Sequence, residues 1–394
     1  MKTLGIYGPQ LPERSGVAYF AATMMPELER TFRCVQVSNR YWVSPHKFDF
    51  TLYHVGASAR HHCVFRAIHE RPGITIIHEH NCLSYYYESW PELSEESKQE
   101  FLHHVSARLG TTFLTLEEVQ RCLDLRADPD RYAADVAIER LYMSRITGAV
   151  THSPYIARML RRRYPAVPIA TLPFMAARLT LLSGRRARQS LGVSDQDFLF
   201  GTFGFIGEYK RTDKILAAWN SWRDRPAWVK LLIVGERQQF IDIPQRADVI
   251  YLDFVEGERQ FQAYLSAVDC AIQLRHPTLG ETSAVISTLL ANNKRVITSD
   301  TPYTVPYVRQ RNVLRVRPDQ NEIPRLCDCF RKTLLLPYVA ARYCEAHSPA
   351  AYVRRLVTLI RDEPGNAQHG FMKGSDWSCS RKPNSKPAVT PICQ

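Results

Sequence analysis

Two short segments in the second half of the chain carry residues that together could bind a diphosphate. In the first, an apolar run enters a turn at Gly204 and Phe205 and leads to Lys210 at the start of a helical pattern. In the second, residues 280–283 follow another apolar run and again precede a helical pattern. Backbone amides at strand ends and helix N-termini bind phosphate groups, and a lysine strengthens such a site. The two segments therefore predict a site for a nucleoside diphosphate sugar.

Lys210 is the strongest single candidate for chemistry. An ammonium group at the carboxyl edge of a sheet can stabilise the charge of a departing nucleoside diphosphate without a metal ion. A cation at a helix N-terminus is unfavourable unless an anion joins it, which favours this role over that of a surface lysine. Replacing Lys210 with Ala should reduce turnover far more than replacing His61, which we interpret as a surface or helix residue.

The segment 280–283 offers a second set of donor-binding groups. Gly280 permits close approach of the backbone, and Thr282 and Ser283 could present amides and hydroxyl groups to phosphate. We assign Glu281 to hydroxyl groups of the ribose or of the transferred sugar. The structural alternative is a helix cap with an acidic first turn. Three further candidates lie beside these two segments: Arg211, Arg275 and His276.

Residues in the first half could contact the sugar and the acceptor. Gly16 lies between a predicted strand and a predicted helix, where a substrate can approach the backbone. His78 and Glu79 close another predicted strand; His78 would hydrogen-bond to sugar hydroxyl groups, and Glu79 would order it or meet the acceptor. His80 shares one side of the strand with His78, but a metal site would need further ligands. A structural cluster at the strand end is the remaining alternative.

The cysteines and the acidic pairs do not indicate a metal. The 10 cysteines include no Cys-x-x-Cys pair, and reduced thiols in a cytoplasm are the simplest interpretation. Asp128 and Asp130 have the spacing used by metal-dependent sugar transferases, but they lie in a helical region, and we interpret them as a helix-start turn. We therefore expect no metal and no cofactor besides the nucleoside diphosphate sugar, which is the donor substrate.

The length and the apolar pattern indicate two globular domains. A chain of 394 residues exceeds what one hydrophobic core usually serves. No apolar run reaches the roughly 18 residues that a membrane span needs, and the N-terminus resembles a first strand rather than a cleavable signal. We expect the protein in the cytoplasm.

Short runs rich in Val, Ile and Phe alternate with helical patterns, which is typical of parallel sheets covered by helices on both faces. We predict an α/β protein with two Rossmann-like, doubly wound domains that face each other across a cleft. The predicted strands are 4–7, 34–37, 50–54, 74–78, 149–152, 169–172, 198–205, 230–234, 249–252, 270–274 and 296–298. The predicted divisions are an acceptor-binding domain (1–183) with a helical insertion (88–145), a nucleotide-sugar domain (184–345), a helix that packs back on the first domain (346–362) and a disordered tail (363–394).

One segment concentrates the net charge of +12. Between residues 155 and 188 it holds eight arginines and no acidic residue: Arg158, Arg161, Arg162, Arg163, Arg178, Arg185, Arg186 and Arg188. Such a segment could contact anionic lipid or a phosphorylated acceptor; a solvated basic helix end and linker is the alternative. We predict peripheral contact with the inner face of a membrane. Nucleic acid is not predicted as a partner, because no basic strand with interleaved aromatic residues and no recognition helix accompanies the arginines.

With these motifs, residues 1–360 resemble the retaining glycosyltransferases of family 4, which have the GT-B architecture. Residues 8–16 are similar to the acceptor-side glycine loop of that family, and residues 76–79 to its strand ending in His-Asp, here His-Glu. Residues 203–210 resemble its Gly-Arg…Glu-Lys segment, which binds the donor diphosphate. Residues 269–300 resemble its nucleotide-sugar segment, which usually holds two glutamates separated by seven residues.

The chain departs from the family pattern at three points. Phe205 stands where the family has a phosphate-binding arginine, for which a neighbouring arginine could substitute. Glu281 lies close to the first glutamate position, whereas Thr288 or its neighbours fill the second, which typically holds the ribose. Residues 292–294 replace a small Ala-x-Gly segment.

The resemblance implies a metal-independent transfer of a sugar from a nucleoside diphosphate to an acceptor hydroxyl, with retention of configuration. The product would be a bacterial polysaccharide, a glycolipid or a glycosylated natural product. Two alternatives stay open: a nucleotide-sugar epimerase or hydrolase on the same architecture, and a non-catalytic binding protein that kept the fold. Product analysis without acceptor separates the first alternative from transfer, and nucleotide binding without turnover would indicate the second.

Overall fold

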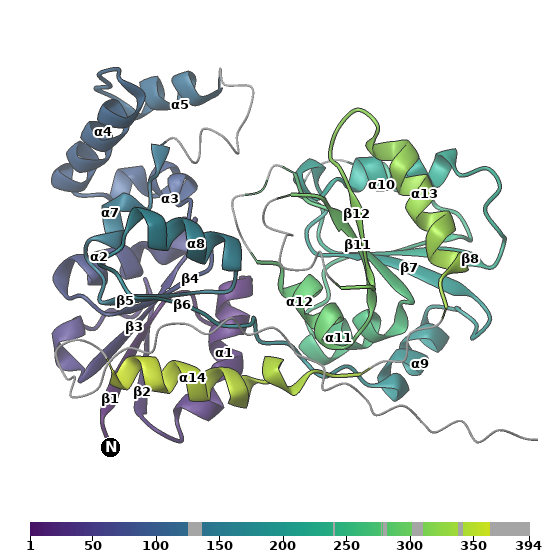
Figure 1. Ribbon diagram of the computed structural model, residues 1–394, viewed down its shortest axis with the longest axis horizontal. Helices are drawn as coiled ribbons and strands as arrows, with labels where there is room; N and C mark the ends of the chain where they lie inside the picture. The colour runs from purple at the N-terminus through teal and green to yellow at the C-terminus, as the bar shows by residue number, and fades with distance from the viewer. Residues whose placement is uncertain are drawn as a thin grey trace, which may run out of the picture.

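The computed structural model describes residues 1–124, 136–238, 241–276, 278, 282–301, 310–337 and 342–362. These residues form two six-stranded parallel sheets with helices on both faces (Figure 1). In order across the first sheet, the strands are β2 (Arg33–Val37), β1 (Thr3–Tyr7), β3 (Phe50–Val55), β4 (Ile74–Ile77), β5 (Gly148–Thr151) and β6 (Ile169–Thr171). Across the second they are β12 (Val313–Val316), β11 (Arg295–Ser299), β10 (Cys270–Gln273), β7 (Phe198–Phe203), β8 (Val229–Val234) and β9 (Val249–Leu252).

The strand order identifies both domains as doubly wound. In each sheet the chain adds strands in one direction from an inner strand and then in the other, with β1 beside β3 and β7 beside β10. Parallel strands require helical crossovers that cover both faces, and all six residues of β3 are accordingly buried. The predicted α/β class with two Rossmann-like domains is confirmed. One observed strand, β12, was not predicted from the sequence. It lies at the edge of the sheet, and of its four residues only Val316 is buried.

Each domain has a hydrophobic cluster on either face of its sheet. In the first domain α1 (Gly16–Leu28) and α14 (Pro349–Arg361) cover one face, and α2 (His62–Glu70) and α8 (Pro154–Arg163) cover the other. In the second domain α10 (Thr212–Ser221) and α13 (Glu322–Leu335) lie on one face. The opposite face carries α9 (Leu181–Ser190), α11 (Glu258–Ala267) and α12 (Ala284–Ala291).

Between β4 and β5 lies a helical region, which Figure 1 shows beyond the end of the first sheet. Its helices are α3 (Leu83–Ser89), α4 (Glu95–Leu109), α5 (Leu116–Asp124) and α7 (Arg140–Met143). Short 3-10 helices complete the described elements: η1 (Pro45–Lys47), η2 (Ala59–His61), η3 (Trp90–Glu92), η4 (Glu208–Lys210) and η6 (Glu345–His347). Among the described residues, no helix combines the length and the apolar character needed to span a bilayer.

The chain returns to the first domain at its described C-terminal end. Tyr352, Leu356 and Ile360 of α14 are fully buried in the same cluster as Phe20 of α1. The segment 363–394, for which we predicted disorder, lies outside the described residues.

The predicted domain boundary, between residues 183 and 184, falls inside α9. Thr180 caps this helix by accepting a hydrogen bond from Ser183 N at 3.3 Å. Gly184 faces α11 so closely that a Cβ atom would lie 2.8 Å from Ser266 Oγ. Gly184 therefore serves helix packing, and α9 packs in a hydrophobic cluster of the second domain.

Candidate functional site

Loops at the carboxyl ends of the strands of both domains meet. Arg14, in the loop after β1, lies with Nη2 3.3 Å from Glu256 Oε1 and Nη1 3.9 Å from Glu236 Oε2. Its guanidinium carbon is also 4.3 Å from the centre of the Phe254 ring. Glu236 follows β8, and Phe254 and Glu256 follow β9. The loops that follow β1, β8 and β9 therefore lie together at the carboxyl ends of their strands, where ligands of doubly wound domains bind.

Lys210 lies over the turn that ends β7. Gly204 adopts a φ of +103°, and a Cβ atom there would be 3.7 Å from Lys210 Nζ. Gly235, which the sequence analysis missed, ends the neighbouring β8 with a φ of +153°. A Cβ atom on Gly235 would lie 1.9 Å from Gly204 O. Only glycine permits this close approach of the two turns, in which the Gly204 and Gly235 amides donate to Val234 O and Leu252 O at 3.0 Å.

The two segments predicted to bind diphosphate approach each other at Tyr209. Lys210 Nζ lies 5.6 Å from the centre of the Tyr209 ring, and the guanidinium carbon of Arg275 lies 5.8 Å from it. The backbone N–H of His276 donates to Tyr209 O at 2.9 Å. The ends of β7 and β10 are thereby tied together, and two cations flank one aromatic ring. Sequence reasoning identified Lys210 and Arg275 but not the tyrosine between them.

Arg211 has a structural partner. Its guanidinium forms an ion pair with Glu322, and its Nε donates to Glu322 Oε2 at 3.0 Å. Glu322, at the start of α13, is 1% exposed. Arg211 also adopts a left-handed backbone conformation, with a φ of +58°, as the residue before α10. This arginine joins two helices of the second domain, and its contact with a donor stays a prediction.

The remaining predicted donor residues divide into described and undescribed positions. Ser283 caps α12 by accepting a hydrogen bond from Ile286 N at 3.3 Å, which is the structural alternative considered above. Thr282 precedes it and is half-buried, as is Phe205. Gly280 and Glu281 lie outside the described residues, as do Asp128 and Asp130. Whether Glu281 contacts the donor therefore stays a prediction.

In the first domain the predicted contacts lie after β1 and β4. Gly16 begins α1, and a Cβ atom there would have no described atom within 4 Å. Glu79 Oε2 accepts a hydrogen bond from Ala57 N at 2.6 Å, which orders the loop after β3. His78 is half-buried, and its Nε2 lies 2.9 Å from His54 Nδ1. His54 ends the predicted strand 50–54, so the signal that identified His78 was also present there.

Burial keeps this group of histidines neutral. Desolvation lowers the pKa of His54 to about 3 and that of His152 to about 4, and holds the pKa of His78 well below its ordinary value. His61, interpreted from the sequence as a surface or helix residue, is 3% exposed. Its ring occupies the space that a Cβ atom on Gly56 would need. His61 is therefore a core residue and is unsuitable as a neutral control.

Within the described ranges, no three His, Cys, Asp or Glu side chains converge as a metal site would require.

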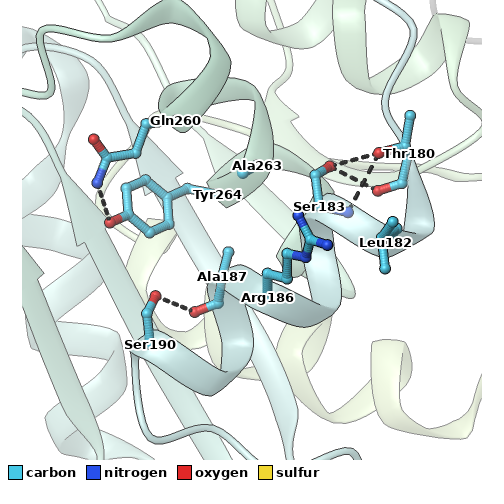
Figure 2. Close-up of a pocket in the computed structure, with 9 residues that line it drawn as sticks. All are labelled: Thr180, Leu182, Ser183, Arg186, Ala187, Ser190, Gln260, Ala263 and Tyr264. Atoms are coloured by element: carbon cyan, nitrogen blue, oxygen red, sulfur yellow. Dashed lines mark hydrogen bonds between the residues drawn. The ribbon is translucent and has the colours of Figure 1, made fainter.

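Figure 2 shows a pocket of about 390 Å³ between α9 and α11, lined in part by Leu182, Arg186, Gln260 and Tyr264. None of the predicted site residues lines this pocket.

The arginines of 155–188 do not form one surface. Arg161 Nη2 donates to Ile169 O at 2.8 Å, Arg163 pairs with Glu139 at 2.5 Å, and Arg188 pairs with Asp269 at 3.1 Å. Arg158 and Arg162 lie on α8 of the first domain, and Arg185 and Arg186 lie on α9 of the second (Figure 1). Arg178 lies between β6 and α9 and pairs with Glu345 at 3.8 Å. The exposed arginines of α9 adjoin Leu181 and Leu182, which are 63% and 62% exposed.

No protein-family model matches the chain, and no curated protein matches its sequence. Solved structures do match its fold. One is WaaG, a glycosyltransferase involved in lipopolysaccharide biosynthesis, at a TM-score of 0.53 and 14% identity over 92% of this chain and 100% of that chain. Another is HepE from Anabaena in complex with UDP and glucose, at a TM-score of 0.51 and 11% identity over 91% of this chain and 95% of that chain. A third is sucrose-phosphate synthase from Thermosynechococcus elongatus, at a TM-score of 0.53 and 13% identity over 91% of this chain and 95% of that chain. The chain thus has the two-domain GT-B architecture of these proteins.

Proposed function

We propose that the protein is a glycosyltransferase that moves a sugar from a nucleoside diphosphate to an acceptor hydroxyl. The observation that carries this proposal is that Lys210 and Arg275 lie 5.6 Å and 5.8 Å from the centre of the Tyr209 ring, with Lys210 also beside the glycine turn that ends β7. Two cations near strand ends suit a diphosphate. Two of the similar structures, WaaG and HepE, are a glycosyltransferase and a complex with UDP and glucose, which supports a donor of this class.

In the proposed reaction, Lys210 and Arg275 stabilise the negative charge that develops on the leaving diphosphate. Thr282 and Ser283 contribute backbone amides at the start of α12, and Glu281 orients hydroxyl groups of the donor. His78 contacts the sugar from the facing domain, and the acceptor binds near Gly16 and Glu79. We propose transfer with retention and without a metal ion, with Arg211 supporting the site from its pair with Glu322.

The proposed acceptor is a saccharide, a lipid-linked sugar or a small molecule, in the synthesis of a polysaccharide, a glycolipid or a glycosylated natural product. A lipid-linked acceptor would explain the exposed leucines and arginines at the start of α9. We propose that this surface contacts an anionic membrane peripherally, at its inner face.

The test is binding of a panel of UDP-, GDP-, ADP-, CDP- and TDP-sugars with EDTA present throughout. Wild type is compared with Lys210→Ala and with a control, Lys214→Ala, which removes a cation from α10 that pairs with Asp213 at 3.1 Å. We expect one nucleotide to bind, and Lys210→Ala to weaken it roughly 10- to 100-fold, as loss of a charged hydrogen bond does. Lys214→Ala should bind as wild type does.

Other outcomes would contradict specific parts of the proposal. Binding that appears only when a divalent cation replaces EDTA would overturn metal independence alone. Release of free sugar or an epimer without acceptor would indicate a hydrolase or an epimerase. Absence of binding to every nucleotide, with EDTA and with added divalent cation alike, would refute the glycosyltransferase and favour a binding protein for another ligand.

A further inference from the structure

Three adjacent strands of the first sheet are each followed, or ended, by a histidine. His54 belongs to β3, and His78 and His152 directly follow β4 and β5. The rings of His54 and His78 stack with centres 5.2 Å apart and planes 12° apart. The Phe20 ring meets His78 edge-on at 4.9 Å. The His152 ring is a third neighbour, with its centre 5.7 Å from that of His78, so only part of the His78 ring is accessible.

The hydrogen bond between His54 and His78 contains one proton and can be arranged in two ways. Both rings are neutral, so each carries one N–H and one lone pair. Either His54 Nδ1–H donates to His78 Nε2, or His78 Nε2–H donates to His54 Nδ1. In a neutral histidine the bond made by one ring nitrogen decides which nitrogen carries the proton. The first arrangement therefore leaves an N–H on His78 Nδ1, and the second leaves a lone pair there.

The second nitrogen of His54 distinguishes the two arrangements. His54 Nε2 is buried and has no hydrogen-bond partner among the described residues. If His78 donated, His54 would carry its proton on this nitrogen, as a buried N–H without an acceptor. Orphaned N–H groups are rarer in proteins than unfilled lone pairs on acceptors. His54 therefore carries its proton on Nδ1 and donates.

Two other buried histidines of the domain follow the same rule without ambiguity. His152 Nδ1 contacts Leu172 O at 3.3 Å, and His61 Nδ1 contacts Ser58 O at 3.2 Å. A carbonyl oxygen only accepts, so both residues carry the proton on Nδ1. In both, as in His54, Nε2 is buried and unpartnered within the described part of the chain.

We propose that His54 is a positioning residue that holds His78 as its Nδ1–H tautomer, so that His78 presents a hydrogen-bond donor to the ligand. His78 Nδ1 makes no hydrogen bond with the described residues and is not among the buried unpartnered atoms. The N–H on His78 Nδ1 then donates to an oxygen lone pair of the ligand, such as that of a sugar hydroxyl or a carboxylate. A ligand with an ammonium group at that position offers no lone pair and is rejected. The identity of the ligand as a sugar rests on the proposed function, but the tautomer does not.

The first experiment measures the side-chain ¹⁵N spectrum of His78 in the ligand-free full-length protein, with His78→Gln used for assignment. The expected spectrum has a protonated Nδ1 and an unprotonated Nε2. A protonated Nε2 would overturn the proposal, whatever the protein binds. The expected tautomer without any nucleotide-sugar binding would refute the proposed function and leave the role of His54 intact.

Variants of His54 supply the second readout. In His54→Asn the side-chain amide nitrogen takes the place of Nδ1–H, so His78 should keep its tautomer. In His54→Leu the donor is lost, so His78 should change tautomer, and kcat/KM for the donor found in the panel should fall roughly 3- to 10-fold, as for one hydrogen bond. His152→Leu is the control, because His152 is also buried and its ring centre lies 5.7 Å from that of His78, but it does not hydrogen-bond to His78. An unchanged His78 spectrum in folded His54→Leu, or the same change in His152→Leu, would contradict the inference.

Discussion

At the scale of single residues, burial decides which protonation states are accessible. His54 and His152 have folded-state pKa values near 3 and 4, below the ordinary value of 6.5. Below pH 6.5 the unfolded chain binds protons at these histidines and the folded protein does not. The contribution of these neutral histidines to the free energy of unfolding is therefore fully present above pH 6.5 and is lost as the pH falls toward 4.

We predict that the free energy of unfolding falls between pH 6.5 and pH 4, by about 1.4 kcal/mol per pH unit for each buried histidine whose pKa is lowered in this way, among them His54 and His152. Urea unfolding at a series of pH values measures this slope. His152→Phe should reduce the slope, because it removes one titrating group while filling the same space. A slope equal to that of wild type would show that the histidine titrates alike in both states.

At the scale of elements, Arg211 and Glu322 join the starts of α10 and α13. We predict that Arg211→Ala lowers the free energy of unfolding by about 3–5 kcal/mol, because it leaves a buried carboxylate without its counter-charge. Urea unfolding followed by the fluorescence of Trp219 and Trp222, both buried in the second domain, measures the loss. Adding Glu322→Gln to Arg211→Ala should recover part of it. A loss that persists in full would mean that the charge of Glu322 is not the cause.

A second prediction at this scale concerns the exposed start of α9. We expect the protein to bind vesicles that contain anionic lipid and to dissociate as salt is added. Replacing Arg185 and Arg186 by Ala should weaken the salt-dependent binding, and replacing Leu181 and Leu182 by Ser should weaken what remains at high salt. Leu335→Ser is the control, since Leu335 is 85% exposed on α13. Binding that ignores both lipid charge and salt would refute the membrane contact.

At the scale of the whole molecule, the contact of Arg14 with Glu236 and Glu256 is one bridge between the domains. All three side chains are substantially exposed, and exposed ion pairs contribute about 0–1 kcal/mol. These two ion pairs therefore contribute little to holding the domains together.

We predict that added salt shifts the protein toward a more open arrangement, because screening weakens these pairs. Fluorescence energy transfer between one dye on each domain measures the separation. Arg14→Ala should be open already and respond little to salt, whereas Arg60→Ala, which removes an exposed arginine of the first domain, should respond as wild type does. Equal responses from wild type and Arg14→Ala would contradict the prediction.

The segment between β6 and α9, which links the two domains, is tied to both of them by contacts that the sequence did not indicate. Asn292 Nδ2 donates to Ala177 O at 2.7 Å, and its Oδ1 accepts from Leu179 N at 2.9 Å. His347, just before α14, contacts Phe174 O at 2.9 Å. Asn292, within the residues noted as a departure from the family pattern, therefore holds residues 177–179 in place.

The sequence by itself determined the alternation of strands and helices and the positions of Lys210, Arg275 and His78 at strand ends. These follow from local pattern, because apolar β-branched runs form buried parallel strands and their carboxyl ends face one edge. Only the tertiary structure decided the partners: Arg211 with Glu322, His54 with His78, and His61 in the core over Gly56. Residues distant in sequence meet through strand order and crossover packing, and no local pattern specifies which side chains come within hydrogen-bonding distance.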